Sequence, residues 1–577
     1  MIILGLNIFH ADTSAALVVN NKIISAIEEE RFTKIKHYSG LPINAIQHCL
    51  NSASLNILEV DIIAVNYNSK YNFFEKALFG IKNINFSIFD KLISLKKKNN
   101  VKNILEEALN KKINAKIVYV PHHIAHIASS YFISGLEEAI GVTFDGSGDF
   151  STSECFILEN NSINIIDKVN YPNSLGIFYQ TFTQYLGFQN YGDEYKVMGL
   201  ASYGKPKYID RVRKIISYDK TGNFKLNLKY FNHYNNIINF KFNEGLPIFS
   251  NFFNHKFIEL FGNQRSLTNK IEEYHKDLAS SVQKVFEEII ILKILHLHAK
   301  YGKKNLVLSG GCFFNSTLNG KIHDLELFDN IFVSPFVGDM GGGLGAALYL
   351  INEREHFKNL PLDNPYLGSD FSNEYIEREI IKEKNLENSD TIDCEHYKNF
   401  SEITTLIAKK ISENKLVGWF QDKSEFGPRA LGNRSLLANP INKEIKKIIN
   451  EKIKKRENFR PFAPIILEES YEDYFYQKFP SPYMSFVFKA KEKAKNEIPG
   501  VVHVDGTSRV QTVNKNQNSK IYELLIEFKK LTNVPVLLNT SLNINEPINN
   551  DPLTAYQTFT KSNIDILVMQ NYVFTKK

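Results

Sequence analysis

Two neighbouring stretches decide the fold, PHHIAH at residues 121–126 and GVTFDGSGD at residues 141–149. The first begins with a proline, which suits the first turn of a helix. On a helix His122 and His126 lie one turn apart on the same face, a common way to offer two nitrogen ligands to a metal ion. The second stretch reads as an apolar strand with an acidic, glycine-rich turn at its end, where Asp145 is placed to close on the same ion.

Two histidines alone fit a helix that merely packs or caps as well as they fit a metal site, because short motifs produce false positives. Asp145 and a second carboxylate further along the chain, Asp339, favour the metal. The glycines of the turn also let backbone N–H groups approach a phosphate. Gly146 and Ser147 are therefore candidate ligand-binding residues.

The succession of strand, polar turn and strand occurs twice. In the first copy, strands are predicted from residue 2 and over 14–19 and 22–27, and the first turn contains His10 and Asp12. In the second copy, strands are predicted over 140–144 and 153–158. Such a repeat is expected of the sugar kinase, actin and chaperone superfamily, in which two related lobes hold a nucleotide between them.

Two glycine-rich turns follow the clearest predicted helix, residues 278–300. Each turn comes between a predicted strand and a helix, so that a helix N-terminus could meet a phosphate or a nucleoside without obstruction. The polar segment at 191–201 reads as a loop that could contact a polyhydroxyl substrate or simply lie on the surface. The two turns supply Gly310, Gly311 and Asn315, and then Asp339, Gly341 and Gly342.

The overall composition is that of a globular protein with more than one domain. The chain has 577 residues, 43% of them hydrophobic and 23% charged, and contains no run long enough for a membrane span. The apolar opening lacks a basic region and reads as part of the fold, not as a signal peptide. Four scattered cysteines without a CxxC pair argue against disulfides and indicate the cytoplasm.

Composition also predicts where the domains divide. The segment after Leu350 is charged, contains prolines and a glycine, and reads as a linker. We expect a first domain at residues 1–352, a linker at 353–373 and a second domain at 374–577.

Cationic side chains of the second domain fall in Gly-, Pro- and Ser-rich turns between apolar strands. Arginines in such turns commonly bind anions through the two parallel N–H groups of the guanidinium. The net charge of +6 fits anionic small substrates as well as nucleic acid and does not distinguish them. The sequence shows no aromatic platform or basic stripe of the kind that nucleic-acid-binding modules have. We expect no nucleic-acid partner and no membrane partner. The candidate anion-binding residues are Arg429, Arg434, Lys455, Arg460 and Arg509, with Asn539 and Ser541 as neutral hydrogen-bond partners.

Several of these motifs, in this order, resemble those of the O-carbamoyltransferases of the nodulation-factor, cephamycin and tobramycin type. The resemblance extends from residue 5 to beyond residue 545. The matching motifs are His10-Ala11-Asp12, His122 to His126, Asp145-Gly146, Ser309-Gly310-Gly311, Gly427-Pro428-Arg429-Ala430-Leu431-Gly432, Arg460-Pro461-Phe462-Ala463-Pro464 and Asn539-Thr540-Ser541.

The resemblance implies an α/β fold with two active sites. The C-terminal domain looks like a YrdC-type domain, which in the family joins carbamoyl phosphate to ATP, supplied with Mg²⁺, and releases phosphate and pyrophosphate. The product, carbamoyl-adenylate, then binds to the N-terminal two-lobed domain, which is similar to that of the tRNA threonylcarbamoyl-adenosine enzymes. There the carbamoyl group passes to a hydroxyl of the acceptor, beside a divalent metal that is iron in some relatives. The implied metal ligands are His122, His126, Asp145 and Asp339.

Further roles follow from the resemblance. His10, with Asp12 beside it, is the candidate general base for the acceptor hydroxyl, since histidine titrates near neutrality; alternatively it only bonds within its turn. The expected acceptor is a sugar, a nucleotide-sugar or another natural product. The oligomeric state stays open, with a homodimer among the alternatives. Carbamoyl-adenylate is expected against Gly146, Ser147, Gly310, Gly311, Asn315, Gly341 and Gly342.

Three other functions share parts of this pattern. A tRNA-modifying threonylcarbamoyl transferase has the metal-bearing domain, but the second domain and the missing basic stripe count against it. A hydrogenase-maturation carbamoyltransferase would normally bring cysteine zinc motifs, which the sequence lacks. A non-enzymatic actin- or chaperone-like ATP-binding module would not use carbamoyl phosphate.

Overall fold

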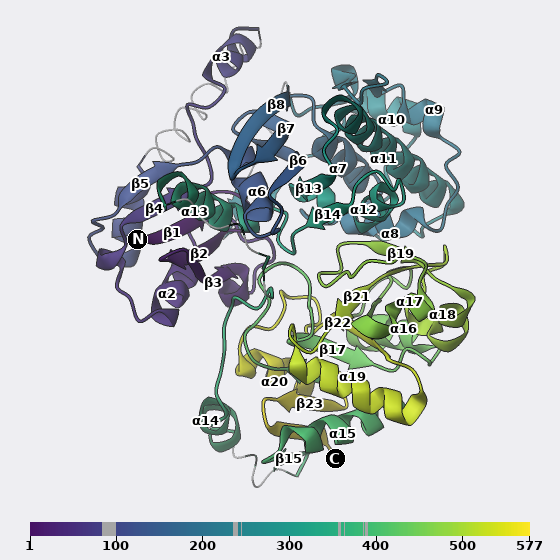
Figure 1. The fold of residues 1–577 in the computed structure, drawn as a ribbon. Coiled ribbons are helices and arrows are strands. Elements are labelled where there is room, and N and C mark those ends of the chain that lie inside the picture. The colour runs from purple at the N-terminus through teal and green to yellow at the C-terminus, as the bar shows by residue number, and fades with distance from the viewer. Residues whose placement is uncertain are drawn as a thin grey trace. The chain divides into compact units, whose positions relative to one another are not determined.

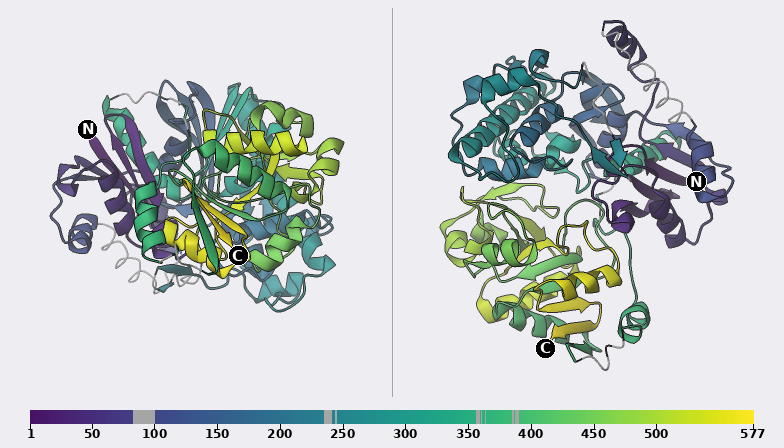
Figure 2. Two further views of the ribbon diagram at one scale, coloured as in Figure 1. Left: turned by 90° about the horizontal axis from the view of Figure 1, so that it is seen from below. Right: turned by 180° about the vertical axis from the view of Figure 1, so that it is seen from behind.

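The computed structural model describes residues 1–577 except 83–99, 235–240, 244, 356–358, 360, 363, 385 and 387–389. The chain forms two compact units, Met1–Leu362 and Asp363–Lys577 (Figures 1 and 2). The boundary between them falls within the segment predicted as a linker. Among the described residues, no helix has both the length and the apolar character needed to cross a membrane.

The first unit contains two five-stranded sheets with the same strand order. In each sheet three antiparallel strands are followed by two parallel ones, so the predicted repeat and the two-lobed fold of the sugar kinase, actin and chaperone type are confirmed. In order across the sheets, the strands are β3 (Lys22–Glu28), β2 (Ser14–Val19), β1 (Ile2–Asn7), β4 (Ile62–Val65) and β5 (Lys116–Tyr119), and then β8 (Ser162–Asn170), β7 (Ser151–Glu159), β6 (Glu138–Gly148), β13 (Asn305–Ser309) and β14 (Asn330–Val333).

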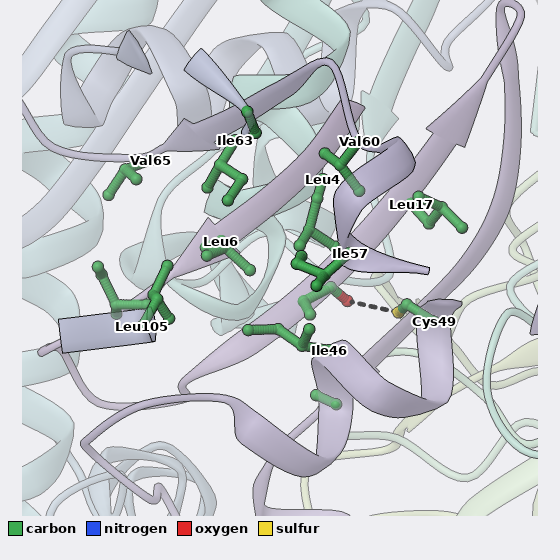
Figure 3. Close-up of a cluster of buried hydrophobic side chains, with 14 of the residues drawn as sticks. Leu4, Leu6, Leu17, Ile46, Cys49, Ile57, Val60, Ile63, Val65 and Leu105 are labelled. Atoms are coloured by element: carbon green, nitrogen blue, oxygen red, sulfur yellow. Dashed lines mark hydrogen bonds between the residues drawn. The ribbon is translucent and has the colours of Figure 1, made fainter. Parts of the chain in front are cut away.

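The first sheet is apolar on both faces because helices cover both. On one face, Leu4 and Leu6 of β1 belong to a buried cluster with residues of α2 (Ile43–Ser52) and α5 (Val101–Leu109) (Figure 3). Within this cluster the Cys49 thiol donates to the carbonyl oxygen of Ala15 at 3.5 Å. Cutting Leu4 or Leu6 back to alanine is expected to destabilise the unit by about 2–5 kcal/mol.

Helix α13 (Met340–Glu355) covers the other face of β1 and also packs on α6 (His122–Tyr131). Glycines allow this close approach. A Cβ at Gly5 would lie 2.0 Å from the carbonyl oxygen of Gly343, and one at Gly345 would lie 1.8 Å from that of Ala125. The packing brings the first turn of α6 beside the start of α13.

Helices surround the second sheet, and the 29-residue α11 (Glu273–Tyr301), the longest described one, contains the helix predicted over residues 278–300. The prediction of a loop over 191–201 was wrong, because α8 begins at Glu194. The remaining α-helices among the described residues of the unit are α1 (Glu30–Thr33), α3 (Phe73–Lys82), α7 (Leu175–Tyr185), α8 (Glu194–Ala201), α9 (Ile209–Val212), α10 (His255–Phe261) and α12 (Ser316–His323), with short strands β9 (Ile216–Tyr218), β10 (Phe224–Leu226), β11 (Lys241–Asn243) and β12 (Leu246–Ile248).

The second unit is built on one mixed sheet of eight strands. In order across the sheet these are β15 (Ile392–His396), β24 (Tyr572–Lys576), β23 (Ile566–Met569), β16 (Val417–Phe420), β17 (Arg434–Ala438), β22 (Val536–Ser541), β18 (Ala463–Leu467) and β21 (Gln511–Val513). Smaller elements are α14 (Asn373–Ile376), α15 (Phe400–Ser412), α16 (Ile445–Ile448), α17 (Tyr471–Tyr474), α18 (Glu492–Glu497), α19 (Ser519–Thr532), α20 (Pro552–Lys561), β19 (Val487–Lys489) and β20 (Thr507–Arg509).

Candidate functional site

Four side chains of the first unit meet at one point. The Nε2 atoms of His122 and His126, one turn apart on α6, are 3.0 Å from each other. Asp145, near the end of β6, lies 3.2 and 2.9 Å from these two nitrogens. Asp339, just before α13, lies 3.5 and 3.3 Å from them. The sequence prediction that these four residues converge therefore agrees with the geometry.

The donor set fits a divalent metal ion. Neighbouring ligand atoms that each lie about 2.1 Å from one ion are roughly 3.0–3.4 Å apart, and the five distances given above run from 2.9 to 3.5 Å. Two imidazoles with two carboxylates suit Fe²⁺, Mn²⁺ or Zn²⁺. All four ligand atoms lie within 4.8 Å of one another, and both histidines are buried.

The four side chains also shift one another's pKa. Burial raises the pKa of Asp339, and the nearby Asp145 carboxylate raises it further. Burial also opposes the charge on His126, but hydrogen bonds to Asp145 and Asp339 outweigh it and raise its pKa to about 9. A divalent cation bound among these groups would neutralise both carboxylates at once.

The two predicted catalytic residues lie in the β1–β2 turn. The His10 ring is centred 5.6 Å from the His122 ring, which puts His10 beside the metal ligands. Asp12 instead binds His37, with 2.7 Å between its Oδ1 and Nδ1 of the imidazole. The Tyr191 ring packs on His37 at 5.2 Å. Three separate segments of the chain therefore line this side of the site.

Sequence reasoning missed His37, because no motif spacing links it to Asp12. It also left Glu194 with an ambiguous role in a supposed loop. In the structure Glu194 opens α8, and burial raises the pKa of its carboxyl to about 7. The cation at His37 lowers that pKa, and the carboxylates of Asp193 and Asp12 raise it further.

The His37–Asp12 pair predicts a pH-dependent stability. Burial disfavours the charge on His37, but Asp12 outweighs it and raises the pKa of His37 from 6.5 to about 9. A raised pKa stabilises the fold fully below pH 6.5, and this contribution is lost as the pH rises through 9. We expect His37→Gln to destabilise the first unit by about 1–3 kcal/mol below pH 6.5 and by less above pH 9. Thermal unfolding of both proteins across this range measures the difference, and a gap that widened with pH would contradict the assignment.

Three predicted ligand-binding glycines have protein atoms where a Cβ would be. A Cβ at Gly310, whose φ is +90°, would lie 2.4 Å from the carbonyl oxygen of Phe144. One at Gly341 would lie 2.1 Å from that of Phe336, and one at Gly342 would lie 2.2 Å from Nδ2 of Asn66. Close packing against these atoms requires glycine at all three positions, and their contact with carbamoyl-adenylate stays a prediction.

Of the other predicted nucleotide-binding residues, one has a structural role and three remain candidates for ligand contact. Asn315 caps α12 by accepting the Leu318 N–H, and its amide pairs with Gln283 at 2.9–3.0 Å, so it too has a structural role. A Cβ at Gly311 would lie 3.0 Å from Oδ1 of Asp145, one at Gly146 would meet nothing within 4 Å, and Ser147 is exposed. Gly146, Ser147 and Gly311 therefore remain candidates beside the metal ligands.

In the second unit, a buried carboxylate shapes the loop that carries Arg429. Oε1 of Glu425 accepts the backbone N–H groups of Leu431, Asn433 and Arg434 at 2.7, 2.9 and 3.2 Å. Sequence reasoning missed Glu425, because a lone glutamate in a polar segment looks like a surface residue. Its three hydrogen bonds fix the loop without any bound ligand.

The prediction that Arg434 binds an anion needs correction. Its guanidinium is buried, lies 3.6 Å from the centre of the Phe420 ring and donates to backbone carbonyls. The acceptors are the carbonyl oxygens of Ser369, Gln421, Asp422 and Asn433. Arg434 therefore holds the loop together from inside.

Arg429 and Arg509 form the strongest candidate anion site in this unit. Burial, with the neighbouring Arg509 cation second, lowers the pKa of Arg429 well below its ordinary value. Burial lowers the pKa of Arg509 to about 10. Two partly desolvated guanidinium groups that repel each other are stabilised when an anion binds between them.

The other predicted anion-binding residues of the second unit differ in how deeply they are buried. Lys455 is exposed, and Arg460 pairs with Glu457 at 3.6 Å. The Asn539 amide donates to Gln511 at 2.8 Å, and its buried Oδ1 has no hydrogen-bond partner among the described residues. Ser541 donates to Oδ1 of Asn543 at 2.8 Å, and the same oxygen accepts from the buried Lys454 at 2.6 Å. Lys454, not the predicted Lys455, is the buried cation of this pair.

Comparison with known proteins identifies the family. The carbamoyltransferase N-terminus family model matches residues 2–348, and the carbamoyltransferase C-terminus family model matches residues 408–576. Uncharacterized protein sll1178 of Synechocystis sp. is 35% identical, over 100% of this chain and 96% of that protein. Nodulation protein NolNO of Sinorhizobium fredii is 34% identical, over 99% of this chain and 80% of that protein. Uncharacterized protein MJ1051 of Methanocaldococcus jannaschii is 33% identical, over 98% of each.

The two family models together cover most of the chain and define a group-transfer enzyme. The chain belongs to the carbamoyltransferase family. The family predicted from the sequence motifs is thereby confirmed, and the protein is a carbamoyltransferase.

Proposed function

We propose that the enzyme is an ATP-dependent O-carbamoyltransferase that works through carbamoyl-adenylate. The observation that carries the proposal is the convergence of His122, His126, Asp145 and Asp339 on one point. The family supports the carbamoyl group, and the nodulation proteins among the relatives favour a saccharide acceptor. Among the acceptors expected from the sequence, we therefore favour a sugar-containing one.

The second unit would form the intermediate from carbamoyl phosphate, ATP and one water, releasing phosphate and pyrophosphate. Arg429 and Arg509 would neutralise the phosphate groups of the two substrates, which is the anion their repulsion and burial favour. Asn539 would offer its buried Oδ1 as an acceptor. Lys455 and Arg460 would lie further from the bound phosphates than Arg429 and Arg509 and would attract anions from solution.

The first unit would carry out the transfer. The acceptor oxygen attacks the carbamoyl carbon, the bond from that carbon to the AMP oxygen breaks, and the hydroxyl proton leaves. His10, whose ring lies 5.6 Å from that of His122, would take this proton. When bound, the divalent metal, which we propose to be iron, would act as a Lewis acid for negative charge on the carbonyl oxygen. Gly146, Ser147 and Gly311 would lie along the adenylate.

The proposal predicts that ATP is converted to AMP and pyrophosphate only when carbamoyl phosphate is present. Pyrophosphate release measured with and without carbamoyl phosphate tests this. Equal release under the two conditions would contradict the proposal. Mass spectrometry across a panel of sugars, nucleotide-sugars and other hydroxyl compounds would then identify the acceptor by the gain of one carbamoyl group.

Transfer to tRNA is the remaining alternative with the same first unit. Labelled carbamoyl phosphate incubated with tRNA should leave no label in the RNA. We also propose that the enzyme acts in the cytoplasm, which agrees with its four free cysteines.

A further inference from the structure

One short segment, residues 145–149, touches the metal-ligand histidines at more than one point. At its start Asp145 contributes a ligand atom. At its end the Asp149 carboxylate oxygen Oδ2 accepts the backbone N–H of His122 at 2.9 Å. The same oxygen accepts the backbone N–H of Asn68 at 2.7 Å. Asp149 therefore joins the loop after β4 to the first residue of the helix that carries both histidines.

His122 needs such support because of its place in the helix. The first N–H groups of a helix have no partner within it. Helix α6 begins after Pro121, and no side chain at that position caps it. The Asp149 carboxylate supplies the missing acceptor from another element, in the place where a negative charge also favours a helix N-terminus.

Gly148 fixes the ring of the same histidine. A Cβ at Gly148 would lie 2.0 Å from Cδ2 of the His122 ring, so the imidazole lies directly against this glycine's backbone. The Asp149 backbone has a φ of +51°, a left-handed conformation, and its carbonyl oxygen accepts a hydrogen bond from Asn72 at 3.2 Å. The tight turn is thus held in a conformation that presents Gly148 to the ring and Asp149 to the helix start.

We propose that Asp149 is a positioning residue for the metal centre: it fixes the backbone of His122, while Gly148 fixes the plane of its ring. This inference rests on the proposed metal site. Residues that orient metal ligands without touching the metal commonly change metal affinity about 10- to 100-fold when they are replaced.

The test measures metal binding directly, on the full-length protein. Co²⁺ is titrated into the metal-free protein, and its visible absorption bands report the affinity. We expect Asp149→Ala to weaken Co²⁺ binding about 10- to 100-fold. Asp149→Asn should stay close to wild type, because its amide oxygen can accept the same two N–H groups. Gly148→Ala is an independent second variant, and it should weaken binding by displacing the His122 ring.

Asp551→Ala is the matched control. Asp551 caps α20 in the second unit by accepting the Thr554 N–H at 2.9 Å, so this change removes a helix cap that belongs to a different unit from the metal ligands. It should leave Co²⁺ affinity unchanged. Circular dichroism identifies the variants that fold.

The outcomes separate this inference from the function on which it rests. If wild type fails to bind Co²⁺, or His126→Ala binds it equally well, the metal site itself is wrong. If wild type binds through His126 but folded Asp149→Ala binds as tightly, the inference is overturned. An Asp149→Asn variant as weak as Asp149→Ala would also overturn it, since the hydrogen bonds would then not be what matters.

Discussion

His126→Ala is expected to abolish carbamoyl transfer while leaving the release of pyrophosphate that depends on carbamoyl phosphate. His126 is buried, and its Nε2 lies within 3.3 Å of both carboxylates. Its loss removes a ligand whose metal would contribute several kcal/mol to the transfer step, about 100- to 1,000-fold in rate or more. The two activities are measured separately, as carbamoylated product and as pyrophosphate.

His123→Gln is the matched control on the same helix. His123 is also buried, but its Nδ1 lies 2.8 Å from the Thr143 hydroxyl, and burial lowers its pKa to about 3, so it stays neutral. This variant should retain metal and transfer. If His126→Ala lost both activities while still folded, the idea of two separate sites would fail.

Arg429→Ala is expected to show the opposite pattern. Adenylate formation should fall about 10- to 100-fold, the effect of removing a hydrogen-bonded charge from an anion. Transfer from supplied carbamoyl-adenylate should continue, because Arg429 belongs to the second unit and the metal ligands belong to the first. Arg429→Lys should form adenylate at a rate between those of wild type and Arg429→Ala, since lysine keeps the charge but lacks the planar guanidinium.

Arg378→Ala provides the comparison for a generic loss of arginine. Arg378 lies in the same unit, is 71% exposed and pairs only with its neighbour Glu379 among the salt bridges of the described residues. Its replacement should change neither activity. An Arg429→Ala variant that formed pyrophosphate at the wild-type rate would rule out the anion site.

The sequence predicted that most of the candidate metal ligands lie close together because two local rules apply to them. Residues four apart on a helix share a face, and a residue at the end of a strand lies at the edge of its sheet. Once the repeat indicated a two-lobed fold, these rules brought His122, His126 and Asp145 together, and Asp339 was added from its glycine-rich turn and from the family resemblance. Their convergence needed no knowledge of the side-chain packing around them.

The glycines and arginines show where sequence reasoning stops. A glycine that lets a ligand approach the backbone looks the same in sequence as one that lets a helix approach, and Gly345 of α13, which lies against the Ala125 carbonyl of α6, is of the second kind. Likewise, an arginine in a polar turn can face an anion, as we propose for Arg429, or bind carbonyls inside the fold, as Arg434 does. Only the tertiary contacts distinguish them.

The contacts of His37 and Asp149 lay beyond prediction for another reason. Each of these residues acts on a segment distant in sequence: His37 on Asp12, and Asp149 on His122. No periodicity connects such pairs. Their partners became visible only when the turns between the strands had defined positions.

Anomalous X-ray diffraction from crystals of the protein prepared with Fe²⁺ without oxygen tests the central claim most directly. We expect one strong peak at about 2.0–2.3 Å from the Nε2 atoms of His122 and His126 and from the carboxylates of Asp145 and Asp339. A peak bound elsewhere, with these four side chains hydrogen-bonded only to one another, would contradict the account.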